Sequence, residues 1–302
     1  MVTNRLRDMD PVAAMLHALD LTDTGARTNE DIFTGPSQWM PNGRVFGGQV
    51  LAQSIIAASR TIPDGRLIHS LHGYFLRPGV VDKGVTLGVD RIHDGRSFST
   101  RRVQTYQDGV PIMSLIASFQ PEQDGISHQI DMPAGVPAPE SLKTVSEHLA
   151  GIEHPAAQFW TEARAFDIRY VDQPVYLPLA DTGERVARQA VWLRAKKRLA
   201  DDPVLHRAAM AYASDYTILE PALRRHGLVW ATPGLKMASL DHAMWWHRPA
   251  RADEWLLFVE DSPSAQGGRG LAQARVYRED GALVATVAQE GMLRVPGDAS
   301  GR

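Results

Sequence analysis

The sequence contains no cysteine among its 302 residues. This absence excludes disulfide bonds, thiolate metal sites and cysteine nucleophiles, and it agrees with a reducing compartment. The chain also lacks any apolar run near the roughly 20 residues that span a bilayer. Its N-terminus, MVTNRLRDMDPVAAMLHALDL, lacks the uninterrupted apolar core of a signal peptide, and its last residues, DASGR, carry no peroxisomal tripeptide. We therefore expect a cytoplasmic protein with no membrane partner.

An excess of charge of one sign is absent as well, because the formal net charge is −3 and acidic and basic residues are mixed along the chain. No nucleic-acid partner is therefore expected. No H-E-x-x-H or comparable ligand spacing surrounds the histidines, so we expect no metal ion. No G-x-S-x-G elbow occurs, which argues against a serine nucleophile. The length suits two domains of an ordinary globular protein.

The chain does contain a long internal repeat. SLHGYFLRP at residues 70–78 and SLDHAMWWHRP at residues 239–249 share Ser-Leu at the start and Arg-Pro at the end. In both copies the similarity continues through a Gly-Arg turn and an Asp-Gly dipeptide, at residues 108–109 and 280–281. Asp-Gly is typical of tight hairpins, and the apolar residues around it alternate as in half-buried strands. A repeat of this length predicts a duplicated domain.

Each half also has one helical segment ahead of its strands. Residues 46–60 are apolar on nearly every side, which predicts a buried helix. In residues 201–223, apolar residues recur at spacings of three and four, and Pro203 stands near the start. One buried helix followed by antiparallel strands predicts, in each half, a sheet wrapped around a helix, and therefore the α+β class.

The two halves are separated by a segment rich in Pro, Gly and Ser, PEQDGISHQIDMPAGVPAPESLKTV, which has no sustained period. We predict an N-terminal domain at residues 1–135, a linker at residues 136–155 and a C-terminal domain at residues 156–302.

Five segments resemble one family closely and in its own order: RVFGGQVLAQSIIAA, HSLHGYFLRPG, DGRSFSTRRV, ASLDHAMWWHRP and DGALVATVAQEGMLR. The family is acyl-CoA thioesterase II, and the resemblance extends from about Leu19 to Arg294. It implies a double hotdog fold, in which two helix-wrapped antiparallel sheet units of one chain join into a continuous sheet. It also implies hydrolysis of fatty acyl-CoA to free fatty acid and CoA, without metal, cofactor or covalent acyl-enzyme. Exposed sheet edges and the family resemblance both favour a homodimer or homotetramer.

The resemblance implies a catalytic set of an Asp, a Ser or Thr, and a Gln, all in the C-terminal domain. Carried over by motif, the Asp falls on Asp241 and the Gln on Gln289. The hydroxyl residue falls in VEDSPSAQGGRG, on Ser262 or, alternatively, on Ser264. Thioester hydrolysis needs a positioned water, a base, and donors for the developing oxyanion. Partial desolvation beside the tryptophans of its motif would make Asp241 more basic.

Purely structural roles for the same residues stay open. Asp241 would then cap a strand end or pair with Arg248, and Gln289 would lie where the core face of its strand opens to water. A loop serine is by default a turn former. The glycine pair before the first helix offers N–H groups to an oxyanion or phosphate, or serves helix–sheet packing.

The repeat also predicts one catalytic centre per chain. Aligned by their motifs, His72 stands in the N-terminal domain where Asp241 stands in the other, and Ala117 stands where Gln289 does. The N-terminal domain would therefore supply substrate contacts and no chemistry. The substrate-binding residues expected from both domains are Gly47, Gly48, His72, Trp245 and Ser264.

Two other functions are compatible with such a fold. A hotdog enoyl-CoA hydratase or dehydratase needs an Asp and a His on one loop, and the Asn-Pro that its motif carries between them is absent here. A non-catalytic acyl-CoA-binding protein would bind the substrate without turnover.

Overall fold

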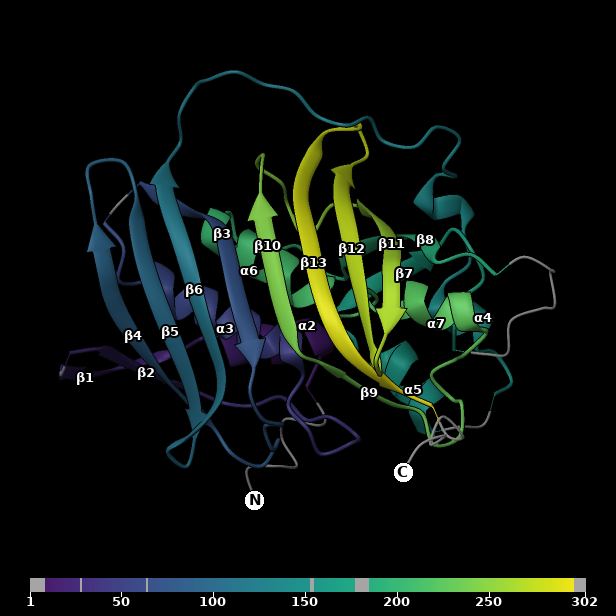
Figure 1. Cartoon of the computed structure of the whole chain (residues 1–302), viewed down its shortest axis with the longest axis horizontal. Coiled ribbons are helices and arrows are strands. Elements are labelled where there is room, and N and C mark those ends of the chain that lie inside the picture. The colour runs from purple at the N-terminus through teal and green to yellow at the C-terminus, as the bar shows by residue number, and fades with distance from the viewer. Residues whose placement is uncertain (1–8, 28, 64, 153–154, 177–184, 296–302) are drawn as a thin grey trace.

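The computed structural model describes residues 9–27, 29–63, 65–152, 155–176 and 185–295. Its strands form one antiparallel sheet that curves around two central helices (Figure 1). Within these residues, no helix is long and apolar enough to cross a membrane.

The first half of the chain builds one side of the sheet, with the strand order β1-β2-β4-β5-β6-β3. Helix α3 packs against the inner face of these strands, and α2 packs against α3. The elements are α2 (Pro11–Leu19), β1 (Thr22–Arg27), β2 (Asp31–Gly35), α3 (Gly47–Ser59), β3 (Arg66–Phe75), β4 (Val85–Asp94), β5 (Ser99–Gln107) and β6 (Val110–Pro121).

The second half continues the sheet in the order β10-β13-β12-β11-β8-β7, with β9 also paired to β13. Helix α6 lies beside α3 under the strands, as Figure 1 shows. The elements are η1 (Pro139–Ser141), α4 (Val145–His148), α5 (Pro155–Glu162), β7 (Phe166–Tyr170), β8 (Arg188–Ala195), α6 (Pro203–Ser214), α7 (Glu220–His226), β9 (Lys236–Ser239), β10 (Asp241–Trp246), β11 (Leu256–Gln266), β12 (Arg269–Arg278) and β13 (Leu283–Arg294).

The two halves join through strands β3 and β10, which carry the two copies of the repeat. They pair antiparallel with Leu71 opposite Met244, so one sheet runs through both halves. This is the α+β double hotdog that the resemblance implies, and that prediction is confirmed. Residues 122–138 form no helix or strand, and Met132 and Val136 pack on the second half of the sheet. The domain bounds inferred from the sequence remain a proposal.

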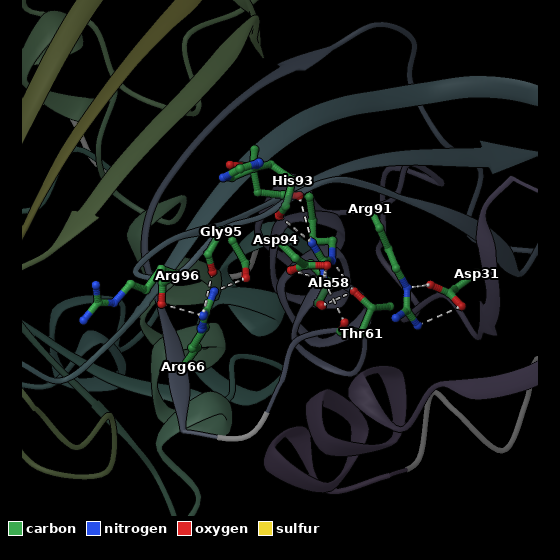
Figure 2. A network of polar contacts seen from close by, with 12 residues as sticks. Asp31, Ala58, Thr61, Arg66, Arg91, His93, Asp94, Gly95 and Arg96 are labelled. Carbon is green, nitrogen blue, oxygen red and sulfur yellow. Dashed lines mark hydrogen bonds and ion pairs between the residues drawn. The ribbon is translucent and has the colours of Figure 1, made fainter.

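A buried arginine of β5, Arg101, links the first half of the sheet to the residues that follow α3. Arg101 has no exposed surface, and its guanidinium donates to both carboxylate oxygens of Asp94 at 2.9 and 3.0 Å and to the Thr61 hydroxyl at 2.8 Å. Figure 2 shows Thr61 and Asp94 within this network. A buried guanidinium is tolerated here because a carboxylate and several oxygen acceptors satisfy it.

The two central helices approach each other closely at Gly48, near the start of α3. The N-terminus of α3 meets the C-terminus of α6, so the helices run antiparallel. A Cβ atom at Gly48 would lie 2.4 Å from the carbonyl oxygen of Tyr212, which is nearer than real Cβ contacts come. The close approach therefore requires glycine at this position.

We expect Gly48→Ala to lower the free energy of unfolding by about 2 kcal/mol, because an added methyl in a packed contact must move backbone. Denaturant unfolding measures this change. Gly125→Ala is the matched control, since a Cβ there meets no atom within 4 Å. Equal stability of the two variants would show that the helix contact has room to relax.

Candidate active site

A cavity of about 790 Å³ opens where the N-terminus of α3 meets the C-terminus of α6. Both halves of the chain contribute to its wall, which is mostly apolar. The first half contributes the polar side chains Asn42, Arg44 and Arg77, and the second half contributes a carboxylate and an amide. Residues that border the cavity include Gly47, Phe75 and Met113 from the first half and Asp215, Ser239 and Gln289 from the second.

Asp215 follows the last residue of α6 and carries the carboxylate of this wall. Its Oδ2 accepts a hydrogen bond from the backbone N–H of Gly48 at 2.8 Å. Its Oδ1 accepts from Nε2 of Gln289 at 3.0 Å and from the hydroxyl of Ser239 at 3.2 Å. Burial away from bulk water raises the pKa of Asp215 to about 6, although these three hydrogen bonds oppose the rise.

Gln289, on β13, is oriented by a buried histidine behind it. Its Oε1 accepts from Nδ1 of His242, and its Nε2 donates to Asp215 and, at 2.8 Å, to the oxygen of Ser239. Burial lowers the pKa of His242 to about 4, so the ring is neutral. A neutral imidazole has one N–H, so Nδ1 donates to the amide while Nε2, 3.1 Å from Ser214 Oγ, accepts. This arrangement turns the NH₂ group of Gln289 toward the carboxylate.

Asp241, the acid carried over by motif, does not lie beside the Gln289 amide in the structure. Successive side chains of a strand point to opposite faces, and His242 points inward. Asp241 therefore points to the outer face, where its carboxylate accepts from the backbone N–H of Glu290 at 2.6 Å. It does not border the cavity.

Ser262 and Ser264, the two alternatives for the hydroxyl residue, lie away from Gln289 in the structure. Both lie on β11, which is separated from β13 by β12. The strand pairing is irregular between Asp261 and Ser264, and the Ser262 hydroxyl donates to the carbonyl of Leu271 at 2.7 Å. The cavity wall includes neither serine. Ser239, at the end of β9, is the serine that contacts Asp215 and Gln289.

Of the residues expected to contact the substrate, some border the cavity and others do not. His72 and Trp245 lie on the outer face of the sheet, their rings 5.0 Å apart, and neither borders the cavity. Gly47 does border the cavity. The N–H of Gly48 is bonded to Asp215, so it is not available to a substrate oxygen.

Sequence reasoning missed Asp215 and Ser239. The sequence places Asp215 inside its helical segment at residues 201–223, whereas the structure ends α6 at Ser214, and the partial negative charge of that helix C-terminus disfavours an acid. A residue that breaks a local rule in this way is often found at a functional site. Ser239 is the first residue of the second repeat motif, two positions before the acid that we chose.

The opposite ends of the same two helices form a second junction with different chemistry. It holds a smaller cavity, about 300 Å³, bordered by Ser59, Arg60 and Asp202. Arg60 follows the last residue of α3, as Asp215 follows that of α6. Among the residues that the structure describes, the acid–amide pair therefore occurs at one junction.

No group of three or more His, Cys, Asp or Glu residues that could hold a metal ion is present within the described ranges. A sheet wrapped around two helices, with a buried carboxylate and amide at one junction, defines a double hotdog protein with a candidate hydrolytic centre.

Comparisons with known proteins agree with this class. The family model for acyl-CoA thioesterase matches residues 162–292, and that for the acyl-CoA thioesterase N-terminal domain matches residues 36–120. Human acyl-coenzyme A thioesterase 8 is 38% identical over 278 residues, which cover 88% of this chain and 86% of the human protein. Acyl-CoA thioesterase 2 of Haemophilus influenzae is 34% identical over 287 residues, 93% of this chain and 96% of its own length.

A solved acyl-CoA thioesterase II from Mycobacterium marinum is 41% identical, with a TM-score of 0.75, and the match covers 95% of this chain and all of that one. The chain belongs to the acyl-CoA thioesterase family, as its sequence resemblance predicted.

Proposed function

We propose that this protein hydrolyses fatty acyl-CoA to free fatty acid and CoA at the cavity where Asp215, Ser239 and Gln289 meet. The observation that supports the proposal most strongly is the carboxylate of Asp215. It is buried, its pKa is raised to about 6, and it borders a mostly apolar cavity of about 790 Å³. A carboxylate of this kind is a better base than one in water.

In the proposed reaction, Asp215 takes a proton from a water molecule as the water oxygen attacks the thioester carbonyl carbon. The amide of Gln289 and the hydroxyl of Ser239 hold that water at the carboxylate. The oxyanion that forms on the carbonyl needs a donor, and the N–H of Gly47 at the start of α3 is our candidate. Collapse of the intermediate breaks the carbon–sulfur bond, and the proton passes from Asp215 to the CoA thiolate.

The hydratase alternative has no comparable support. Both ring nitrogens of His242 lie within hydrogen-bonding distance of protein groups, and the ring does not border the cavity. His247 lies 2.8 Å from the hydroxyl of Thr286 and is likewise outside the cavity wall.

Release of free thiol from a panel of saturated acyl-CoAs, from short to long chains, tests the proposal. A disulfide reagent reports each turnover, and parallel reactions contain a metal chelator. We expect turnover that the chelator does not change. Acyl-CoA binding without thiol release would support the non-catalytic alternative, and rescue of a chelated, inactive enzyme by a divalent ion would contradict the mechanism.

The pH profile of kcat/KM is expected to rise through pH 6 and then level off. Asp215 acts as a base only when ionised, and its pKa is about 6, so the rate at pH 5 should be about tenfold below the plateau. Initial rates across the pH range measure this inflection. An inflection near pH 4 would mean that Asp215 titrates as an ordinary surface carboxylate.

The oligomeric state and the compartment are also part of the proposal. We propose a homodimer or homotetramer in the cytoplasm, and light scattering coupled to size-exclusion chromatography tests the assembly.

A further inference from the structure

The smaller cavity, of about 300 Å³, lies at the far end of the two central helices from Asp215, where α6 begins and α3 ends. Three helices, α2, α3 and α6, contribute aliphatic side chains to its wall: Leu16, Leu19, Ile56, Val204 and Leu205. Leu16, Val204 and Leu205 remain partly exposed. A wall of this kind suits the hydrocarbon part of a ligand, because contact removes apolar surface from water.

Two hydrogen-bond donors border the same cavity. The hydroxyl oxygen of Ser59 is buried and has no hydrogen-bond partner among the described residues. A buried polar atom without a partner is unfavourable, and a ligand that brings an acceptor would satisfy it. Arg60 is the second donor, and 39% of its side chain is exposed. Its Nη1 donates to the carbonyl of Leu21, whereas its Nη2 lies 3.9 Å from the nearest carboxylate oxygen, Oδ1 of Asp20.

The two acids that border the cavity are exposed to solvent. The side chain of Asp20 is 84% exposed, and its contact with Arg60 is at the limit of an ion pair. Asp202 caps α6, since its carboxylate accepts from the backbone N–H of Val204 at 2.9 Å. Water and salt screen both charges. The less exposed polar groups, Ser59 and Arg60, are donors, so they favour a ligand with a negatively charged acceptor.

The two ends of the helix pair therefore favour opposite groups. An acid, Asp215, follows α6 at the larger cavity, and it repels a free carboxylate there. A cation, Arg60, follows α3 at the smaller cavity, and it attracts one. A volume of about 300 Å³ holds roughly ten groups the size of a methylene or a water molecule, at about 30 Å³ each. Octanoate is a carboxylate of that size.

We propose that the cavity beside Arg60 is a second binding site, which takes the free carboxylate of a medium-chain fatty acid. The carboxylate accepts hydrogen bonds from Arg60 and Ser59, and the hydrocarbon chain lies between α2, α3 and α6. The site is separate from the proposed reaction centre, and its ligand belongs to the class of product that this centre would release.

Equilibrium dialysis of the full chain with radiolabelled octanoate tests the site. Saturating S-octyl-CoA, a thioether that cannot be hydrolysed, is present to occupy the larger cavity. We expect one octanoate to bind per chain, with a Kd on the order of 0.1 mM. Octanol and octylamine have the same chain with a neutral and a cationic head group, and we expect both to compete at least tenfold less well.

Arg60→Gln removes the cation and keeps a polar side chain, and it should weaken octanoate binding by about tenfold or more. Arg198→Gln is the matched control, because Arg198 is exposed, pairs with Asp201 and does not border the cavity. Its octanoate binding should equal that of the unmodified protein. Val204→Phe fills the cavity and should abolish this site, with the thioether present or absent. Thiol release from octanoyl-CoA should stay within about twofold in all three variants.

Absence of bound octanoate in the presence of the thioether would overturn the inference. Unchanged binding in Arg60→Gln would overturn it as well, and so would octylamine that competes as well as octanoate, since the head group would then not be recognised. Failure of every acyl-CoA to release thiol would contradict the proposed function and leave the dialysis result in force. A thioesterase without the second site would show the reverse.

Discussion

Asp215→Asn is expected to lower kcat by about 10³-fold, within the range found when a positioned general base is removed. The amide cannot accept a proton from water, whereas its size and shape are close to those of the carboxylate. Asp241→Asn is the matched control, because Asp241 points to the outer face of the sheet and does not border the cavity. We expect it to keep kcat within about twofold of the unmodified enzyme. Thiol release from one good acyl-CoA substrate measures both variants.

The same substitution should stabilise the protein at neutral pH. Burial raises the pKa of Asp215 from its ordinary 3.8 to about 6, so between these values the folded chain binds more protons than the unfolded chain. Stability is therefore lost as pH rises through this window, by up to about 3 kcal/mol above pH 6. Asp215→Asn removes that loss, and denaturant unfolding at pH 4 and pH 7.5 should show a gain at the higher pH alone.

A protein that loses stability and activity together on Asp215→Asn would point to a structural role for this acid. Loss of turnover in Asp241→Asn with normal turnover in Asp215→Asn would restore the assignment made from the sequence motif.

Gln289→Ala is expected to lower kcat by about 10²-fold with little change in KM. The amide of Gln289 contacts the base, Asp215, and positions the attacking water, but it does not bind the substrate. Gln289→Glu should also raise the pH of the kcat/KM inflection, since a second carboxylate next to Asp215 disfavours its ionised form. A purely structural role for Gln289 would not move this inflection. Full pH profiles of both variants distinguish the two roles.

His72→Ala is the control for Gln289→Ala. We expect kcat and KM close to those of the unmodified enzyme, because His72 lies on the outer face beside Trp245. A large effect of His72→Ala on kcat would mean that the first half of the chain contributes to the chemistry.

Much of the fold could be predicted from the sequence because its signals are local. The apolar helix that became α3, and the Asp-Gly turns at Asp108-Gly109 and Asp280-Gly281, mark their elements without information from distant segments. The repeat then indicated two similar units. The family resemblance implied that the two sheets join, but the pairing of β3 with β10 depends on contacts between the halves, which the sequence does not show.

The site was predicted less well because a motif gives positions in the chain and not the face of a strand. In the repeat motif, Asp241 and His242 are adjacent, yet only the histidine points inward, and a shift of one residue exchanges the faces. Asp215 lies within the segment at residues 201–223 that the apolar spacing predicts to be helical, and that spacing says nothing of its role. Only the packing of α6 against α3 brings it to Gly48 and Gln289.

The junction at Arg60 has a practical consequence for engineering. In a symmetric pair of identical halves, every group at one junction would recur at the other, so a buried acid would disfavour folding twice. Here one chain holds both halves, and the two ends of the α3–α6 pair can be altered separately. Substitutions that fill the cavity beside Arg60 should raise the melting temperature without slowing turnover. Substitutions that fill the cavity beside Asp215 should raise the melting temperature but slow turnover.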